Sequence, residues 1–382
     1  MRKGWEYKKF TDVCNVTYGY AFDSKCFTDN PEDTPLIRIR DVKRGFSETF
    51  YNGEIPDGYT VMEGDYLVGM DGEFNIGQWG KRPGVLNQRV CKMNSSSSEL
   101  INQYMYYFMK VCLKSIEDET PFVTVKHLSA KRINMIQIPL PPKSTQLAIV
   151  SELDKINELI RLKKEQLKDF DNLAQSLFYE MFGDPVENEK GWEVKKLGDI
   201  CTDITDGDHM PPPKSEFGIP FITISDIDKD TRCLNFENTF YVPEDYYNNL
   251  KENRKPQKGD LLYTVTGSYG IPVIVKTDKK FCFQRHIALL RPNKEILSTI
   301  FLCYWVLSDG VKFMADKVAT GIAQKTVGLN SIRKFSCILP PLTLQRLFAQ
   351  RIEQIEREKS EVQKSIQDLE TLLASRMQYW FE

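Results

Sequence analysis

The stretch GWEVKKL at residues 191–197 repeats the stretch GWEYKKF at residues 4–10 with two substitutions. Four further blocks recur in the same order: TPLIRIRDV (34–42) with IPFITISDI (219–227), EGDYLVGMDG (63–72) with KGDLLYTVTG (258–267), NQRV (87–90) with FQRH (283–286), and IPLPPKSTQ (138–146) with CILPPLTLQ (337–345). The offset between the copies grows from 187 to 199 residues, as loop insertions would produce. This period is too long for a solenoid, so the blocks indicate a tandem duplication of one domain plan.

The length and charge of the chain agree with two similar halves. A chain of 382 residues is too long for one ordinary core and suggests two domains. The formal net charge is −2, and basic and acidic residues nearly balance within each part of each copy. A polyanion such as nucleic acid would therefore have to bind one local face, because the overall field does not attract it.

The apolar residues and cysteines narrow the class of protein. No run of about 18 apolar residues is present, so we expect no membrane span. The opening MRKGWEYKKF lacks the apolar segment of a signal peptide, and we expect a cytoplasmic protein. The nine cysteines form no CxxC pair, which argues against a disulfide framework and a zinc site and favours buried, reduced thiols.

Each copy ends in a predicted long helix whose apolar residues follow a 4-3 spacing. In the first copy this series is Ile149, Leu153, Ile156, Ile160, Lys163, Leu167, Phe170, Ala174, Leu177 and Met181. In the second copy it is Phe348, Ile352, Ile355, Lys359, Val362, Ile366, Leu369, Leu373, Arg376 and Trp380. A helix packed on a globular body would show a wider stripe of period 3.6, whereas this period of 3.5 is typical of a coiled coil. The simplest partner of each helix is the other.

The rest of each copy mixes short alternating runs, Gly-Asp turns and a helix or two, at 101–116 and 298–316. The sequence therefore predicts an α+β protein with a pseudo-two-fold internal repeat. Two mixed α/β domains are separated by two long helices that pair as an antiparallel coiled coil, a rod of about 50 Å. The predicted boundaries are 1–142 for the first domain, 143–183 for its helix, 184–341 for the second domain and 342–382 for its helix.

No self-sufficient active site is visible in the sequence. The GxxxxGK[ST], HExxH and GxSxG motifs are absent. Asp206, Asp208 and His209 lie together, but a matching fourth metal ligand is missing and the first copy has no equivalent. The LPP stretches resemble the NPPY-type loop of adenine methyltransferases, but Leu140 and Leu339 stand where that loop needs a polar side chain. We therefore predict a non-catalytic protein without a cofactor or metal of its own.

The order of these features resembles a known family. A domain and a long helix occur twice, LPPxxxQ precedes each helix, and LFYEMFGDP (177–185) follows the first one. GIPFITISDI (218–227), KGDLLYTVTG and the GWEVKKLGDI start are also similar to stretches common in the specificity (S, HsdS) subunits of type I restriction–modification systems. The resemblance covers essentially the whole chain.

The resemblance implies a non-catalytic reader of double-stranded DNA. Each mixed domain would be a target recognition domain for one half of a bipartite site, and the paired helices would set the spacing. The helices would also dock two methyltransferase (M) subunits that hold S-adenosylmethionine, while restriction (R) subunits supply ATP-driven translocation and cleavage. TYGYAF (17–22) differs from TDGDHMPPP (205–213), so the two domains should read different half-sites.

The candidate DNA contacts are polar side chains on loops, since Arg, Asn, Gln and Lys read bases while Lys, Arg, Ser, Thr and Tyr bind phosphates. In the first copy they are Arg38, Arg40, Lys43 and Arg44 beside one strand end, and Asn75, Gln78, Trp79, Lys81 and Arg82 in the loop 69–84. In the second copy they are Thr266, Ser268, Tyr269, Thr320, Gln324 and Lys325. Gln88–Arg89 and Gln284–Arg285 recur in both copies, which favours a structural role for them.

Two other classes of function are compatible with parts of the sequence. An autonomous restriction or modification enzyme would need a nucleotide or cofactor motif, which is absent. A coiled-coil scaffold would explain the helices, but it would not explain two dissimilar, loop-rich domains. The first would cut or methylate DNA alone, and the second would bind no DNA even beside a methyltransferase.

Overall fold

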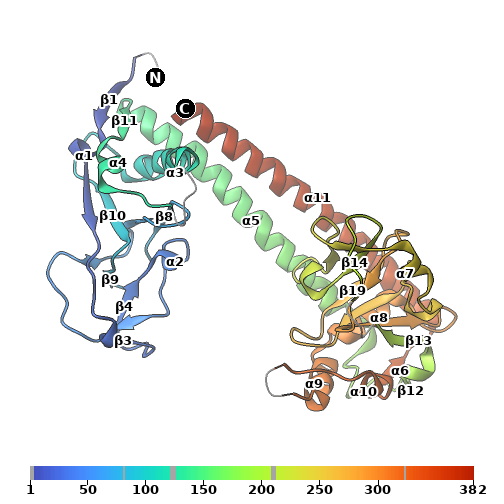
Figure 1. Ribbon diagram of the computed structural model, residues 1–382. Helices are drawn as coiled ribbons and strands as arrows, with labels where there is room; N and C mark the ends of the chain where they lie inside the picture. The colour runs from blue at the N-terminus through green and yellow to red at the C-terminus, as the bar shows by residue number, and fades with distance from the viewer. Residues whose placement is uncertain (1–3, 81, 121–125, 208–211, 322–323) are drawn as a thin grey trace. The chain divides into compact units, whose positions relative to one another are not determined.

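The chain forms two compact units, each of which holds the mixed domain of one copy together with a part of both long helices (Figure 1). Unit 1 comprises Met1–Lys164 and Lys364–Glu382, and unit 2 comprises Glu165–Gln363. This computed structural model describes residues 4–80, 82–120, 126–207, 212–321 and 324–382. Within these ranges, no helix combines the length and apolar character that crossing a membrane requires.

The first copy of the repeat folds into short strands and four helices. Its elements are β1 (Glu6–Lys9), α1 (Phe10–Val13), β2 (Cys14–Tyr18), the 3₁₀ helix η1 (Ser24–Cys26), β3 (Phe27–Thr28), β4 (Thr34–Ile37), α2 (Ile39–Val42), β5 (Phe50–Tyr51), β6 (Thr60–Val61), β7 (Tyr66–Gly69), β8 (Asn75–Gln78), β9 (Gly84–Leu86), β10 (Val90–Ser95), α3 (Asn102–Glu119), α4 (Ala130–Asn134) and β11 (Gln137–Leu140). The long helix α5 (Lys143–Phe182) follows.

The second copy runs through a similar series. Its elements are β12 (Glu193–Lys196), α6 (Leu197–Ile200), β13 (Cys201–Asp206), β14 (Ile219–Ile222), η2 (Ile224–Asp226), β15 (Ile227–Asp228), β16 (Cys233–Leu234), β17 (Phe240–Val242), α7 (Glu244–Asn248), η3 (Glu252–Arg254), β18 (Leu261–Thr264), β19 (Pro272–Ile274), β20 (Cys282–Phe283), β21 (Ile287–Pro292), α8 (Thr299–Leu307), α9 (Asp309–Val318), α10 (Leu329–Arg333) and β22 (Ser336–Leu339). The long helix α11 (Leu342–Phe381) ends the chain.

The sheet topology confirms the duplication. The four-stranded sheet has the order β2-β10-β7-β8 in unit 1 and β13-β21-β18-β19 in unit 2. The opening repeat forms β1, which pairs with β11, and β12, which pairs with β22, both antiparallel. Each unit has a further sheet with one parallel pair, β4 with β9 and β14 with β20. GWEYKKF and GWEVKKL therefore recur because each supplies the strand that closes its domain next to the start of the long helix.

The strand register corrects one block of the sequence alignment. Leu86 pairs with Ile37 in unit 1, and Phe283 pairs with the equivalent Ile222 in unit 2. The next residues, Asn87 and Gln284, then donate their backbone N–H to Ile37 and Ile222. The matching of NQRV with FQRH is therefore wrong by one residue. The recurrence of Gln-Arg is no structural equivalence, because Arg89 corresponds to His286 and not to Arg285.

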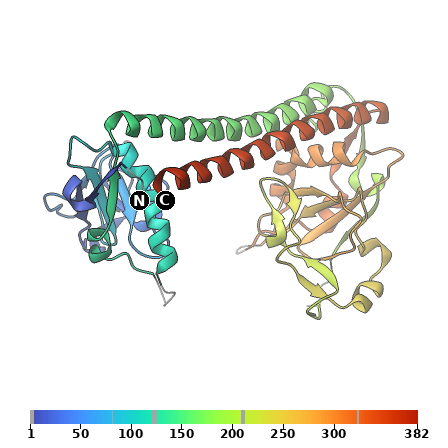
Figure 2. The same cartoon turned by 90° about the horizontal axis from the view of Figure 1, so that it is seen from above.

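The long helices keep the predicted apolar series inside. Figures 1 and 2 draw α5 and α11 as two unbroken helices. Every position of both 4-3 series is buried or half-buried, including Lys163, Lys359 and Arg376. In unit 1, Lys164 Nζ lies 2.8 Å from Glu370 Oε1, and Arg376 pairs with Glu152. In unit 2, Lys359 Nζ lies 2.8 Å from Asp171 Oδ1, and the rings of Phe182 and Phe348 are 5.3 Å apart. In each unit the contacting residue numbers rise along α5 as they fall along α11, so the two helices run antiparallel there.

The helical stretch predicted at 298–316 is confirmed as two helices in succession. Ser308 separates α8 from α9, and its backbone is extended, with φ −64° and ψ 147°. Its hydroxyl donates to the carbonyl of Trp305, 2.7 Å away, which ends α8 in buried surroundings. The stretch Ser308-Asp309-Gly310 interrupts the apolar pattern with residues that favour turns, which is the local signal for this break. The helix predicted at 101–116 is confirmed as α3.

The recurring LPPxxxQ motif holds two helices together. Gln146 is completely buried, accepts a hydrogen bond from the Ile101 N–H that starts α3, and donates to two backbone carbonyls. Gln345 makes the same three bonds in unit 2, with the Ser298 N–H at the start of α8. The motif therefore ties the first turn of each long helix to the helix that packs on the domain's sheet.

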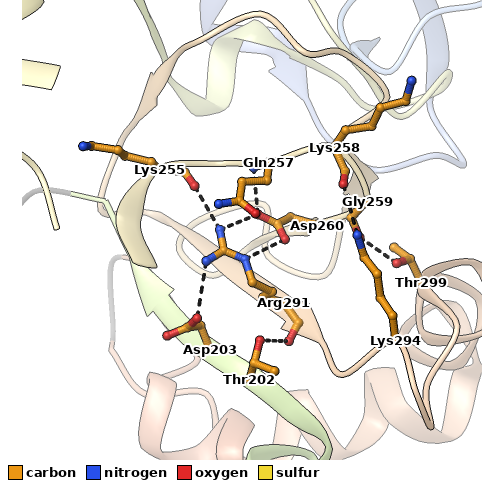
Figure 3. Close-up of polar contacts among 10 residues, drawn as sticks. All are labelled: Thr202, Asp203, Lys255, Gln257, Lys258, Gly259, Asp260, Arg291, Lys294 and Thr299. Carbon is orange, nitrogen blue, oxygen red and sulfur yellow. Dashed lines mark hydrogen bonds and ion pairs between the residues drawn. The ribbon is translucent and has the colours of Figure 1, made fainter. Parts of the chain in front are cut away.

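The recurring Gly-Asp turn anchors the central strand of each four-stranded sheet. Gly64 and Gly259 have φ of 87° and 94°, a backbone conformation that favours glycine. Asp260, only 2% exposed, accepts two hydrogen bonds from the Arg291 guanidinium, at 2.8 and 3.0 Å (Figure 3). In unit 1, Asp65 accepts instead from the Asn94 amide. The aspartate is kept in both copies while its partner differs.

All nine cysteines are free thiols, and six of them are buried, as the sequence predicts. Burial raises the pKa of the Cys91 and Cys303 thiols to about 12. These side chains are therefore protonated near neutral pH and have little reactivity as nucleophiles or metal ligands.

Candidate nucleic-acid interface

Four predicted basic residues surround the short helix α2 at the surface of unit 1. Arg38, Arg40, Lys43 and Arg44 are all exposed. Three of them have nearby acceptors: Arg40 with Thr49, Lys43 with Glu73 and Arg44 with Glu48. Within the described part of the chain, the Arg38 side chain has no partner. These exposed ion pairs are weak and would exchange readily for phosphate oxygens.

The prediction that 69–84 is a loop is wrong in part, because Asn75–Gln78 form strand β8, which pairs with β7. The segment has both surface and interior residues. Gln78 is exposed, and the half-buried Asn75 donates to the carbonyl of Glu73. The prediction that Trp79 contacts DNA is wrong. Its ring is only 3% exposed within an apolar cluster, and its Nε1 donates to the Arg82 carbonyl at 2.7 Å. A buried ring cannot contact DNA at the surface, so Trp79 belongs to the core.

Arg82 is exposed, but its guanidinium has several partners. It donates to the backbone carbonyls of Pro31, Glu32 and Asp33, and it lies over the ring of Phe50. These contacts tie the loop 69–84 to the segment before β4. Lys81, the other predicted basic residue here, lies outside the described residues.

The predicted residues of unit 2 gather where two loops meet. Thr266 pairs with Thr326 in an antiparallel bridge, and Thr326 also pairs with Thr320. Thr266 is only 8% exposed, so its side chain is largely unavailable to a ligand. Gln324 and Lys325 are exposed beside this bridge.

The loop after β18 presents further hydroxyl groups. Ser268 is exposed and its Oγ lies 3.1 Å from the Lys229 Nζ. Tyr269 is half-buried and its hydroxyl donates to Asp316 at 2.5 Å, which raises the pKa of the phenol. These groups form a polar surface of mixed charge with both donors and acceptors.

The same backbone junction underlies the candidate loops of both units. In unit 1, the Met70 N–H donates to the Arg89 carbonyl over 2.9 Å, the Gly72 N–H donates to the Lys126 carbonyl over 2.9 Å, and the Leu128 N–H donates to the Met70 carbonyl over 2.7 Å. In unit 2, the Val265 N–H donates to the His286 carbonyl over 2.9 Å, the Gly267 N–H donates to the Lys325 carbonyl over 3.0 Å, and the Val327 N–H donates to the Val265 carbonyl over 2.9 Å. We call these backbones the unit 1 junction (70–72, 89, 126–128) and the unit 2 junction (265–267, 286, 325–327).

Sequence reasoning missed the polar cluster that lies on the unit 1 junction. The Asp71 carboxylate is 2.5 Å from His127 Nδ1 and 3.5 Å from Arg89 Nε, and Arg89 Nη1 is 3.5 Å from His127 Nδ1. Arg89 was assigned a structural role through the misaligned Gln-Arg pair. Its φ of 70°, rare for a residue other than glycine, is a feature that the sequence cannot signal.

The described residues offer hydrogen-bonding and charged groups but form no metal site. Within the described ranges, no three His, Cys, Asp or Glu side chains gather to hold a metal ion. Asp206 pairs with Arg254 at 3.4 Å, while Asp208 and His209 lie outside the described residues. The arrangement is suited to recognising a polar surface.

Comparison with known proteins gives a consistent result over the whole chain. A family model described as the type I restriction modification DNA specificity domain matches residues 2–169 and again 189–371. The chain is 28% identical to the EcoBI type I restriction enzyme specificity subunit of Escherichia coli, covering 96% of this chain and 82% of that one. It is 23% identical to the MjaVIII specificity subunit of Methanocaldococcus jannaschii, covering 89% and 84%.

A solved structure supports the fold. A chain from a study of complex assembly and conformational transition of the type I R-M system superposes with a TM-score of 0.62. It is 18% identical and the match covers 100% of this chain and 98% of that one.

Proposed function

This chain belongs to the type I restriction modification DNA specificity family, and we propose that it is the non-catalytic subunit that reads a bipartite DNA target. The observation that carries the proposal is the pair of units with one sheet order and one backbone junction but different loop side chains. Two copies of one frame with different surfaces are suited to two different half-sites. Each unit would act as a target recognition domain.

The two long helices would set the distance between the half-sites. Each is a continuous helix of 40 residues, about 60 Å long at 1.5 Å per residue. We propose that they pair along their buried 4-3 series as an antiparallel coiled coil and so act as a spacer. Two readers on one face of the duplex would lie about one helical turn, roughly 10 bp, apart, and the bases between them would be spanned without being read.

The chemistry would reside on partner subunits. Two methyltransferase subunits would dock on the helices and bring S-adenosylmethionine, and restriction subunits would add ATP-driven translocation and cleavage. The type I restriction enzymes named for the relatives support this assignment. In such a complex this chain contributes recognition and spacing, in the cytoplasm, and its own polar loops need only bind DNA.

The proposal is tested by mapping DNA methylation. The chain is co-expressed with the methyltransferase subunit proposed as its partner, and methylated adenines are located across the host genome by single-molecule sequencing. We expect one motif with two short defined halves around a fixed gap. The methyltransferase expressed alone is the control. A stable complex that adds no methylation over this control would refute the proposal.

A further inference from the structure

The two junctions offer an internal comparison that separates structural positions from reading positions. Some positions that bond the backbone carry the same residue in both copies. Asp65 corresponds to Asp260, and Gln146 corresponds to Gln345. The side chains on the junctions differ instead. Unit 1 has Asp71, Arg89 and His127, whereas unit 2 has Thr266, His286 and Thr326.

These two sets of side chains occupy equivalent places. Asp71 and His127 form an antiparallel bridge, as do Thr266 and Thr326. Met70 donates to the carbonyl of Arg89, as Val265 donates to that of His286, both over 2.9 Å. A constant backbone with changed polar side chains is the arrangement expected where each unit must recognise a different sequence.

Arg89 stands out among the unit 1 residues. Its side chain is 55% exposed, so the guanidinium lies at the surface although it also contacts Asp71 and His127. Its φ of 70° is a strained conformation for a residue with a side chain, and such strain persists where the surroundings impose it, often at functional sites. Asp71 and His127 limit the orientations of the guanidinium before any ligand binds.

The chemistry of the two junctions then points to different base preferences. An arginine fork donates two hydrogen bonds to guanine O6 and N7, the commonest specific contact in the major groove. In unit 2 the same place offers the half-buried imidazole of His286 and the half-buried hydroxyl of Thr326, whose Oγ1 lies 3.2 Å from that of the buried Thr266. Burial, and then Arg285, lowers the pKa of His286, so its ring is neutral at pH 7 and either donates or accepts.

We propose that Arg89, oriented by Asp71 and His127, reads a guanine in the half-site of unit 1, and that His286 occupies the base-reading place of unit 2. This inference rests on the proposed function and deepens it, because it assigns one reading position to each half-site. Arg89 touches the base, while Asp71 and His127 act as positioning residues.

The test uses the complete complex with its methyltransferase subunits and the genome-wide methylation readout. Arg89→Gly removes the guanidinium while relieving the positive φ, so the variant should fold at least as well, which a thermal melt verifies. We expect discrimination at one position of the first half to fall on the order of 10- to 100-fold, with the second half and the gap unchanged. His286→Ala is the reciprocal control and should affect only the second half.

Arg89→Lys separates a base contact from a phosphate contact. Lysine keeps the charge but loses the fork, so a base-reading arginine predicts that this variant also loses discrimination. Discrimination retained in both Arg89→Gly and Arg89→Lys, with methylation lowered equally at all sites, would assign Arg89 to a phosphate and overturn the inference. A wild-type split motif that Arg89→Gly leaves unchanged would overturn the inference alone, whereas no motif in the wild type would overturn the proposed function together with it.

Discussion

Replacing Asp260 with Asn should destabilise the four-stranded sheet of unit 2. The carboxylate accepts two hydrogen bonds from Arg291 and one from the Gln257 N–H, and it is nearly inaccessible to water (Figure 3). The hydrogen bond to Asp260 raises the pKa of Arg291, so the guanidinium stays charged. Asn keeps one acceptor oxygen, but its NH₂ group faces at least one donor of Arg291 in either orientation of the amide.

The magnitude follows from these contacts. Removing one partner of a buried ion pair costs about 3–5 kcal/mol, because a buried charge is left without its counter-ion. Asp203, whose Oδ2 lies 3.3 Å from Arg291 Nη1, remains and reduces this cost. We therefore expect the free energy of unfolding of this sheet to fall by about 3 kcal/mol.

The matched control is Asp65→Asn in unit 1. Asp65 is more exposed, its ion pair with Lys92 spans 3.4 Å, and its remaining side-chain partner is the neutral amide of Asn94. A partly exposed pair contributes little, so this variant should lose only about 1 kcal/mol.

Hydrogen exchange followed by mass spectrometry measures the two sheets separately in the same chain. In Asp260→Asn, amides of β18 and β21 should exchange roughly 100-fold faster than in the wild type. In Asp65→Asn, amides of β7 and β10 should exchange only several-fold faster. Equal effects of the two variants, or less than a tenfold change in β18 and β21, would refute the reasoning that burial of the pair decides the cost.

Two further predictions concern the long helices. Gln146→Leu leaves the Ile101 N–H and two carbonyls without their buried partner, so the free energy of unfolding measured in urea should fall by about 2–4 kcal/mol. Gln345→Leu should lower it by a similar amount. A loss below about 1 kcal/mol for either variant would contradict the role of LPPxxxQ. Hydrogen bonds from Arg376, and then from Trp380, lower the pKa of Glu152 below its ordinary 4.5, so its stabilising effect is present above pH 4.5 and is lost as pH falls through the lowered value. Relative to the intrinsic exchange rate at each pH, amides in residues 364–382 should lose protection over that range, whereas Glu152→Gln should show lower protection already at pH 7 and less change on acidification; equal pH profiles of protection would argue against this pair.

Much of the fold could be predicted because its signals are local. The 4-3 spacing lies within each helix, and a helix places residues three and four apart on one face whatever surrounds it. The duplicated blocks likewise show that two domains share one plan. The division at Ser308 has a local signal too, since Ser308-Asp309-Gly310 interrupts the apolar pattern, whereas the hydrogen bond from Ser308 to the Trp305 carbonyl is visible only in the structure.

The candidate site was predicted less well, because exposure and proximity are not local properties. Trp79 lies among the polar residues of a Gly-rich loop, yet its ring fills the core below that loop. Arg82 looks like a free cation in the sequence, but backbone carbonyls some 50 residues away bind it.

The sequence by itself determined the duplication, the two long helices and the resemblance to DNA specificity subunits, since each depends on residue order and short spacings. Only the tertiary structure decided that Arg89 corresponds to His286, and that Asp71, Arg89 and His127 form one cluster. Asp71 and His127 are 56 residues apart in the chain, and strand pairing across the sheet brings them within hydrogen-bonding distance. The physical reason is that strand register is set by long-range backbone hydrogen bonds, and a slip of one residue changes which side chains meet.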